Sequence, residues 1–109
     1  MENRLLAIFD GPARAIRCAS AITEYCSRLG VQTCTGLHTG ECEIVDRQVA
    51  GAAAQMCVCV ANEADAGEVL VSSTVKDLVA GSGINFEDRG VHMFSGCGES
   101  RLFAVQRSA

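Results

Sequence analysis

Apolar and polar positions along the first third of the chain predict a strand followed by a helix. Leu5–Phe9 is a short apolar run with the character of a buried strand. Asp10 fits the N-cap position, and Pro12 suits the first helical turn because its missing N–H would have no partner there. Gly30 is expected to end the helix in a left-handed conformation. Apolar residues recur every three or four positions, which predicts a buried helix face of Ile16, Ala19, Ile22, Cys26 and Leu29.

The middle of the chain predicts a hairpin and a second helix. Residues 31–39 have the pattern of a strand, residues 41–45 that of its partner, and Gly40 suits the bend between them. The polar residues 46–48 are expected to form a loop. A helix is predicted over residues 49–64, with Ala, Met, Cys and Val on most of its faces. Such a helix is usually buried on several sides or covered by another subunit.

The last third of the chain predicts a strand, a short helix and three further strands. Residues 68–71 form a short buried strand, and Ser72 or Ser73 is expected to cap a helix that ends at Gly81. The inward side chains of this helix are predicted to be Val75, Leu78 and Val79. Later strands are expected at residues 85–89, 91–94 and 101–105, with Gly96-Cys97-Gly98 as a turn.

This order of elements predicts an α+β fold. Strands and helices follow one another as β-α-β-β-α-β-α-β-β-β, which favours helices packed on one face of a largely antiparallel sheet. With 109 residues the chain is expected to form one domain, residues 1–109.

Composition and charge exclude several classes of partner. The net charge is −4 and no cluster of Lys and Arg is present, so neither nucleic acid nor a membrane surface is expected as a partner. No apolar run reaches the about 18 residues of a spanning helix, and no secretory signal is recognisable, so a cytoplasmic location is expected. The seven cysteines are odd in number and are expected to be small buried side chains, with exposed reactive thiols as the alternative. Neither a metal site nor a cofactor is predicted.

Four tracts of the chain resemble the catalytic domain of class III adenylate/guanylate cyclases. They are Gly36–Glu41, Gly67–Ser72, Ser73–Gly83 and Phe86–Gly90. The resemblance runs from about Leu5 to Val105 and covers only the second half of such a domain. It implies a ferredoxin-like nucleotide cyclase fold that is truncated at the front, since the family's first strand–helix–strand unit would precede Leu5.

The missing unit has a structural consequence. In the family it carries a metal-binding Asp and a strand that lies centrally in the sheet. Its loss would leave backbone groups unpaired and apolar faces bare. A homodimer or higher homo-oligomer, formed by strand pairing or exchange, is expected to cover these backbone groups and apolar faces.

The same resemblance places the family's active groups on other residue types. Its transition-state Arg falls on Cys59, its ribose-binding Asn on Gln55, and its base-specifying residue on Gln48, with Asp46 nearby. One metal-binding position falls on Asn3. Cysteine supplies no fixed positive charge for the phosphates, so no catalytic residue is assigned.

Three functions from different classes are consistent with these positions. The first is a catalytically inactive cyclase-like half-domain, a self-associating interaction or regulatory module. The second is a module that binds a purine nucleotide or another small molecule through Asp46, Gln48, Gln55 and Cys59. The third is an adenylate cyclase, converting ATP to cyclic AMP and diphosphate, that is completed by a partner. His38 and His92 are expected to be structural, and no base is tied to Ser72 or its neighbours.

Overall fold

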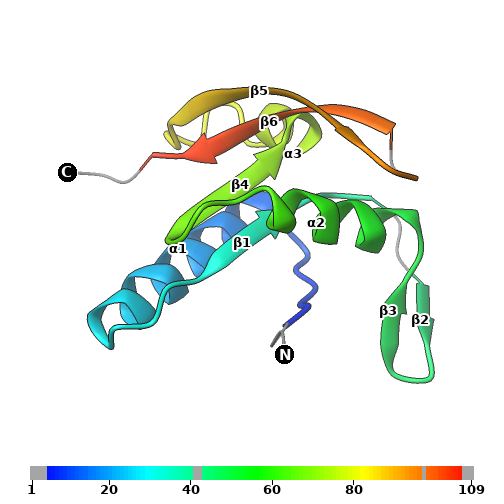
Figure 1. The fold of residues 1–109 in the computed structure, drawn as a ribbon, viewed down its shortest axis with the longest axis horizontal. Helices are drawn as coiled ribbons and strands as arrows, with labels where there is room; N and C mark the ends of the chain where they lie inside the picture. The colour runs from blue at the N-terminus through cyan, green and yellow to red at the C-terminus, as the bar shows by residue number, and fades with distance from the viewer. Residues whose placement is uncertain (1–4, 41–42, 97, 107–109) are drawn as a thin grey trace.

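The computed structural model describes residues 5–40, 43–96 and 98–106. Its elements, in chain order, are α1 (Pro12–Arg28), β1 (Cys34–Leu37), β2 (Glu43–Val45), β3 (Gln48–Ala50), α2 (Ala52–Asn62), β4 (Glu68–Ser72), α3 (Ser73–Leu78), β5 (Phe86–Phe94) and β6 (Gly98–Val105). Figure 1 shows them as a twisted sheet with helices against it and a separate hairpin that projects from the body.

The sheet is mixed. Its strands lie in the order β1-β4-β6-β5, and β2 and β3 form the separate hairpin. β1 and β4 are parallel, whereas β6 runs antiparallel to both of its neighbours. The predicted α+β class is therefore confirmed.

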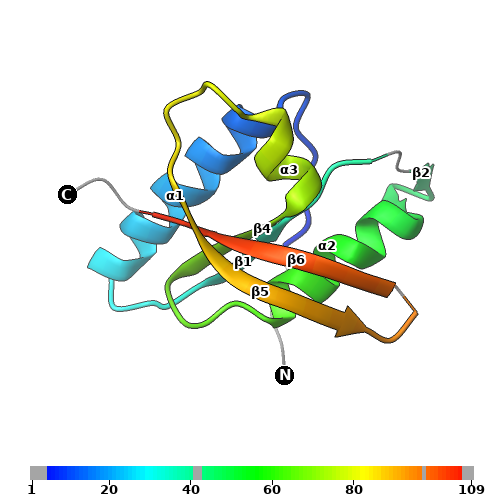
Figure 2. The ribbon, with the colours of Figure 1, turned by 90° about the horizontal axis from the view of Figure 1, so that it is seen from above.

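Helices cover both faces of this sheet, not one face as the sequence suggested. Alternate residues of a strand point to opposite faces. Leu70, Leu102 and Ala104 pack on α2, against Met56 and Val60. The intervening Val71 and Phe103 instead pack against α1 and α3, at Ile16, Val75 and Val79. Figure 2 shows α1 and α3 on one side of the strands and α2 on the other.

The segment Leu5–Phe9 is not a strand. It has no regular secondary structure and pairs with no strand among the described residues. Four of its five side chains are large and exposed, from Leu6 at 40% to Leu5 at 87%. A strand needs a neighbour to satisfy its backbone groups, and the predicted strand at this position is wrong because no neighbour is in place.

The predicted pairing of the middle strands is also wrong. β2 pairs with β3, and β1 pairs with β4 instead. The residues expected to form a loop include Gln48, which begins β3, and a tight turn at Asp46 and Arg47. Both turn residues have positive φ, 51° and 65°. These φ values are those of a two-residue hairpin turn. Such a turn usually contains Asn-Gly, so the residues Asp46 and Arg47 did not indicate it in the sequence.

Helix α1 begins and ends close to the predicted residues but is rotated from its expected face. Pro12 is its first residue, with Gly11 and not Asp10 at the N-cap, and Gly30 has the expected positive φ of 81°. Ile16 is buried as predicted. Ile22 and Leu29 are exposed, however, and Thr23 is buried in their place. Its hydroxyl donates to the carbonyl of Ala19 at 2.8 Å, which satisfies the buried oxygen.

The remaining elements differ from the prediction mainly at their ends, since α2 begins at Ala52 instead of residue 49 and α3 ends at Leu78 instead of Gly81. α3 buries Val75 and Val79 but exposes Leu78, and Ser72 precedes it without a side-chain capping bond. The two short strands predicted between residues 85 and 94 are one strand, β5, with an irregularity between Asp88 and Val91. The predicted turn at Cys97 lies outside the described residues.

Candidate functional site

The predicted binding residues do not all meet at one site. Gln55 lies in the first turns of α2, where its exposed side chain lines a surface groove. Asp46 is exposed in the β2–β3 turn. The backbone of Gln48 lies beside it in β3, but the side chain of Gln48 and the whole of Asn3 lie outside the described part of the structure. Cys59 is half-buried and packs against the apolar cluster of Met56 and Val60, away from the groove lining.

The groove lies at the carboxyl ends of the two parallel strands. It has a volume of about 790 Å³ and opens between the start of α2, the start of α3 and the β5–β6 ribbon. His38 follows β1 and Ser73 follows β4, so the groove sits where ligands usually bind in sheets with parallel strands. Its other polar linings are Gln55, Thr74, Glu99, Ser100 and Arg101.

A hydrogen bond joins the ends of the two parallel strands. The Nδ1 atom of His38 lies 2.7 Å from the Oγ atom of Ser72. Burial lowers the pKa of His38, which favours the neutral imidazole. Contrary to the expectation from sequence, a potential base is therefore tied to this serine.

The pair nevertheless does not form a nucleophilic site. Ser72 is only 1% exposed, so a substrate carbonyl or phosphate cannot approach its hydroxyl. No third group that would orient His38 is found among the described residues. The bond holds the ends of β1 and β4 together, which agrees with the structural role predicted for His38.

The charges of the groove are already neutralised within the molecule. Arg101 places one guanidinium nitrogen 2.8 and 3.1 Å from the two carboxylate oxygens of Asp88. The backbone N–H of Gly90, followed by Arg101, lowers the pKa of Asp88, so this carboxylate stays ionised and keeps its partner. Glu99 adds a negative charge to the lining. Such a groove offers little net positive charge to a triphosphate.

The described residues do not form the two-metal site that the cyclase resemblance implies. Among them, no three His, Cys, Asp or Glu side chains are grouped so that they could hold a metal ion. The one metal position that the sequence places, Asn3, lies outside the described ranges. No catalytic step through a metal ion can therefore be assigned to these residues.

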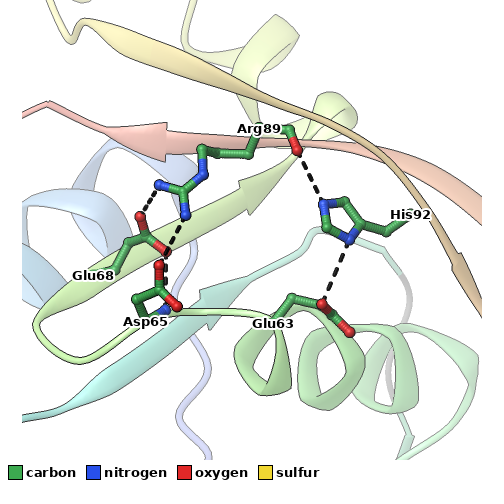
Figure 3. A network of polar contacts seen from close by, with 5 residues as sticks. All are labelled: Glu63, Asp65, Glu68, Arg89 and His92. Carbon is green, nitrogen blue, oxygen red and sulfur yellow. Dashed lines mark hydrogen bonds and ion pairs between the residues drawn. The ribbon is translucent and has the colours of Figure 1, made fainter.

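A second polar cluster lies on the α2 face, remote from the residues that line the groove. Arg89 of β5 contacts Glu68 and also lies 3.0 Å from Asp65, and His92 lies 3.5 Å from Glu63 (Figure 3). The carboxylate of Glu68, followed by Asp65, raises the pKa of Arg89. These contacts fasten the outer strand β5 to the chain between α2 and β4. The cluster is structural, which agrees with the role predicted for His92.

The cysteines are more accessible than the sequence suggested. Cys34, in the outermost strand β1, is exposed, whereas Cys18, Cys26, Cys57 and Cys59 are half-buried. Cys42 and Cys97 lie outside the described residues. The expectation of buried thiols is therefore wrong for Cys34.

Comparison with solved structures identifies the class of fold. No protein-family model and no curated protein sequence matches the chain. An adenylate/guanylate cyclase/hydrolase from Silicibacter pomeroyi superposes with a TM-score of 0.79 at 20% identity, over 93% of this chain and 66% of that one. The catalytic core of a rhodopsin-guanylyl cyclase with converted specificity, solved with ATPαS, gives 0.68 at 14% identity, over 92% and 60%. The adenylyl cyclase CyaB from P. aeruginosa gives 0.58 at 18% identity, over 85% and 54%.

The chain thus has the fold of part of an adenylate/guanylate cyclase catalytic domain. It spans 54% to 66% of the length of these solved chains, which confirms the predicted truncation relative to them. At these identities the likeness establishes the fold alone. Within the described residues, no helix is long and apolar enough to cross a bilayer.

Proposed function

We propose that this chain is a cyclase-fold module that self-associates and does not turn over nucleotide by itself. Uncovered apolar surface is the observation that supports it. Large apolar side chains are exposed on the segment before α1, along α1 and on the projecting hairpin: Leu5, Ile8, Ile22, Tyr25, Leu29 and Ile44. A contiguous patch of such side chains marks an interaction site, and the residues along α1 are close enough in the helix to form one.

Helix α1 carries the clearest part of this surface. Ile22, Tyr25 and Leu29 are spaced by three and four residues, so they lie on one flank of the helix, next to the buried face. The outward side of the helix, away from the sheet, carries Arg14, Arg17 and Arg28. The apolar flank therefore extends past the area that the sheet covers, and a second copy can bury it.

Light scattering with two matched variants tests self-association. Ile22→Arg and Ala80→Arg add the same charge at exposed positions, one on the apolar flank and one in the turn after α3. We expect the wild-type chain and Ala80→Arg to be dimeric or larger. Ile22→Arg should raise the dissociation constant about tenfold or more, since it desolvates a charge within the contact. A monomeric wild-type chain at high concentration would refute self-association.

Cys59 supports the absence of turnover. The resemblance places the family's transition-state cation there, and a thiol packed beside Met56 and Val60 cannot supply a fixed positive charge. We expect no cyclic AMP from ATP with Mg²⁺ or Mn²⁺. Cys59→Arg alone should also be inactive, because the described residues group no set of side chains that could hold a metal ion. Turnover by either chain would contradict this part of the proposal.

A second candidate function is the binding of a purine nucleotide in the groove. Gln55 is the observation that favours it, since an exposed amide at the groove wall can hydrogen-bond a ribose or a base edge. Thermal unfolding with ATP or GTP and Mg²⁺ tests this function. A rise of the transition temperature that Gln55→Ala abolishes would establish binding, and we expect none because the described residues that line the groove include no unpaired cation.

The third candidate is an adenylate cyclase that is completed by a partner carrying the front half of a cyclase domain. It would require a cation other than the Cys59 side chain at the phosphates. Cyclic AMP production after a front-half cyclase domain is added tests it directly, with the Gln55→Ala chain as the control. No activity is expected in either mixture.

A further inference from the structure

We propose that Leu5–Phe9 of one copy adds as a strand to the outer edge of β1 in a second copy. This inference rests on the proposed self-association and adds a second contact to the one along α1. The exchange would be reciprocal, because each copy carries both the segment and the edge. A two-fold pair of this kind is closed, because both segments and both strand edges are then paired.

The outer edge of β1 has backbone groups that no described strand pairs. β1 is the terminal strand of the sheet. The carbonyl of Thr33 accepts from the N–H of Gly67 at 2.7 Å, on the β4 side. Because consecutive residues of a strand direct their N–H and C=O groups to opposite sides, Cys34 and Gly36 direct theirs to the outer edge.

One outward backbone group of this edge already has a side-chain partner, and another does not. The thiol of Cys57 donates to the carbonyl of Gly36 at 3.2 Å, which satisfies one of the outward groups. The backbone of Cys34 has no such contact, and its side chain is exposed. An exposed, unpaired strand edge is a template for pairing with another chain.

The segment Leu5–Phe9 has the complementary properties. It is apolar, and its side chains at residues 5, 6, 8 and 9 are exposed. Figure 1 shows it as an extended trace that leads into α1 without joining the sheet. The same molecule therefore holds a strand-like segment without a neighbour and a strand edge without a neighbour, and they are not paired within that molecule.

Pairing would bury the segment on both faces of the sheet. Gly36 lies against α2, and Leu37, the next residue, packs on the other face near Ile16 of α1. An added strand alternates in the same way, so Leu6 and Ile8 would cover one face, and Leu5, Ala7 and Phe9 the other. This alternation distinguishes a strand from a loose apolar contact.

A cysteine scan against the native Cys34 tests the proposal. Single cysteines are introduced at residues 5 to 9 of the full chain, one per variant, and each variant is mildly oxidised and run on a non-reducing gel. A disulfide requires Cβ atoms about 3.5–4.5 Å apart, so only residues on the same face as Cys34 can react efficiently. We expect covalent dimers at alternate positions, with the neighbouring positions at least several-fold weaker.

Two controls make the pattern specific. Each variant is repeated with Cys34→Ser, which should remove the new dimer band while leaving any band due to other cysteines. Ala80→Cys, exposed in the turn after α3, reports random collision and should give no band dependent on Cys34. Mixing tagged and untagged chains confirms that the product joins two copies.

The outcomes separate this inference from the proposed function. Cross-linking at all five positions or at none overturns strand addition. A monomer with an internal cross-link, seen as a band of altered mobility, overturns exchange between copies. The segment would then lie beside β1 of its own molecule. If light scattering shows a dimer in either case, self-association stands and only the contact proposed here is wrong. A monomer by light scattering overturns both.

Discussion

Gly36 sets the closest approach between a helix and the sheet. A Cβ atom at this position would lie 2.2 Å from the backbone nitrogen of Ala61 and 2.6 Å from its Cα. Backbone atoms of a helix cannot shift as a flexible side chain can. The glycine therefore allows α2 to rest directly on β1, and its neighbour Leu37 reaches the core on the other side.

Gly36→Ala is expected to destabilise the fold. Overpacking against rigid atoms typically costs about 1–3 kcal/mol. Urea unfolding followed by circular dichroism measures the change in the free energy of unfolding. Gly11→Ala is the control, because a Cβ there meets only the Arg14 side chain at 4.0 Å. Equal effects of the two variants would show that α2 does not pack as described.

His38 makes the stability depend on pH in a defined direction. Burial lowers its pKa in the folded chain below the ordinary value of 6.5. The unfolded chain then binds the proton more readily, so this contribution is fully present above about pH 6.5 and is lost as the pH falls through the folded pKa.

The His38 prediction can be measured with one variant. The urea midpoint of the wild-type chain should be lower at about pH 5.5 than at about pH 7.5, two values on either side of the ordinary pKa of histidine. His38→Gln cannot titrate but keeps a polar partner for Ser72, so its midpoint should change less. An equal fall in both chains would mean that His38 does not couple protonation to folding.

At the scale of elements, the hairpin and the outer strand are held by different means. β2 and β3 pair only with each other, and their turn places two non-glycine residues at positive φ. β5 pairs with β6 along its length and is fastened on the α2 face by Arg89. The hairpin is therefore held by contacts between residues close in sequence. β5 is held by its pairing with β6 and by the ion pairs of Arg89.

Arg47→Gly is expected to stabilise the hairpin. Left-handed φ costs an L residue about 1–2 kcal/mol, whereas glycine adopts it freely. Amide exchange at Val45, whose N–H faces Gln48 in the pair next to the turn, should slow by a corresponding factor of about tenfold. Arg47→Ala removes the same charge but keeps the strain, so exchange should not slow in that chain. Equal protection in both variants would exclude the backbone explanation.

The ion pairs of Arg89 should contribute unequally. Glu68 is 15% exposed in its side chain, whereas Asp65 is 80% exposed and loses little in water when it is unpaired. Glu68→Gln should therefore lower the urea midpoint several times more than Asp65→Asn. In the Arg89→Met background the difference between these two variants should shrink. If it persists, Glu68 acts through contacts other than Arg89.

At the scale of the whole molecule, stability should depend on protein concentration. A contact between copies that forms only in the folded state stabilises it by mass action. The thermal midpoint of the wild-type chain is expected to rise over a hundredfold increase in concentration. That of Ile22→Arg should rise less, because this variant weakens association. A midpoint independent of concentration would argue against the self-associating module.

Sequence pattern alone located most of the regular structure. Pro12 and Gly30 mark the two ends of α1, and the apolar run before Ser72 forms β4. These elements were predictable because capping residues and short apolar runs act locally. The cyclase fold and its truncation were likewise readable from tracts such as Gly67–Ser72. The ligand-binding role that this placement implies for Gln55 stays a prediction.

Contacts between distant residues decided the rest. The hairpin turn at Arg47, the exposure of Ile22, the bond from His38 to Ser72 and the unpaired state of Leu5–Phe9 depend on which element lies beside which. A strand exists only when a neighbour accepts its backbone groups, and a helix face is buried only where the sheet meets it. The sequence by itself determined most of the elements and the class of fold, whereas tertiary packing determined which apolar surfaces are covered and which are left exposed.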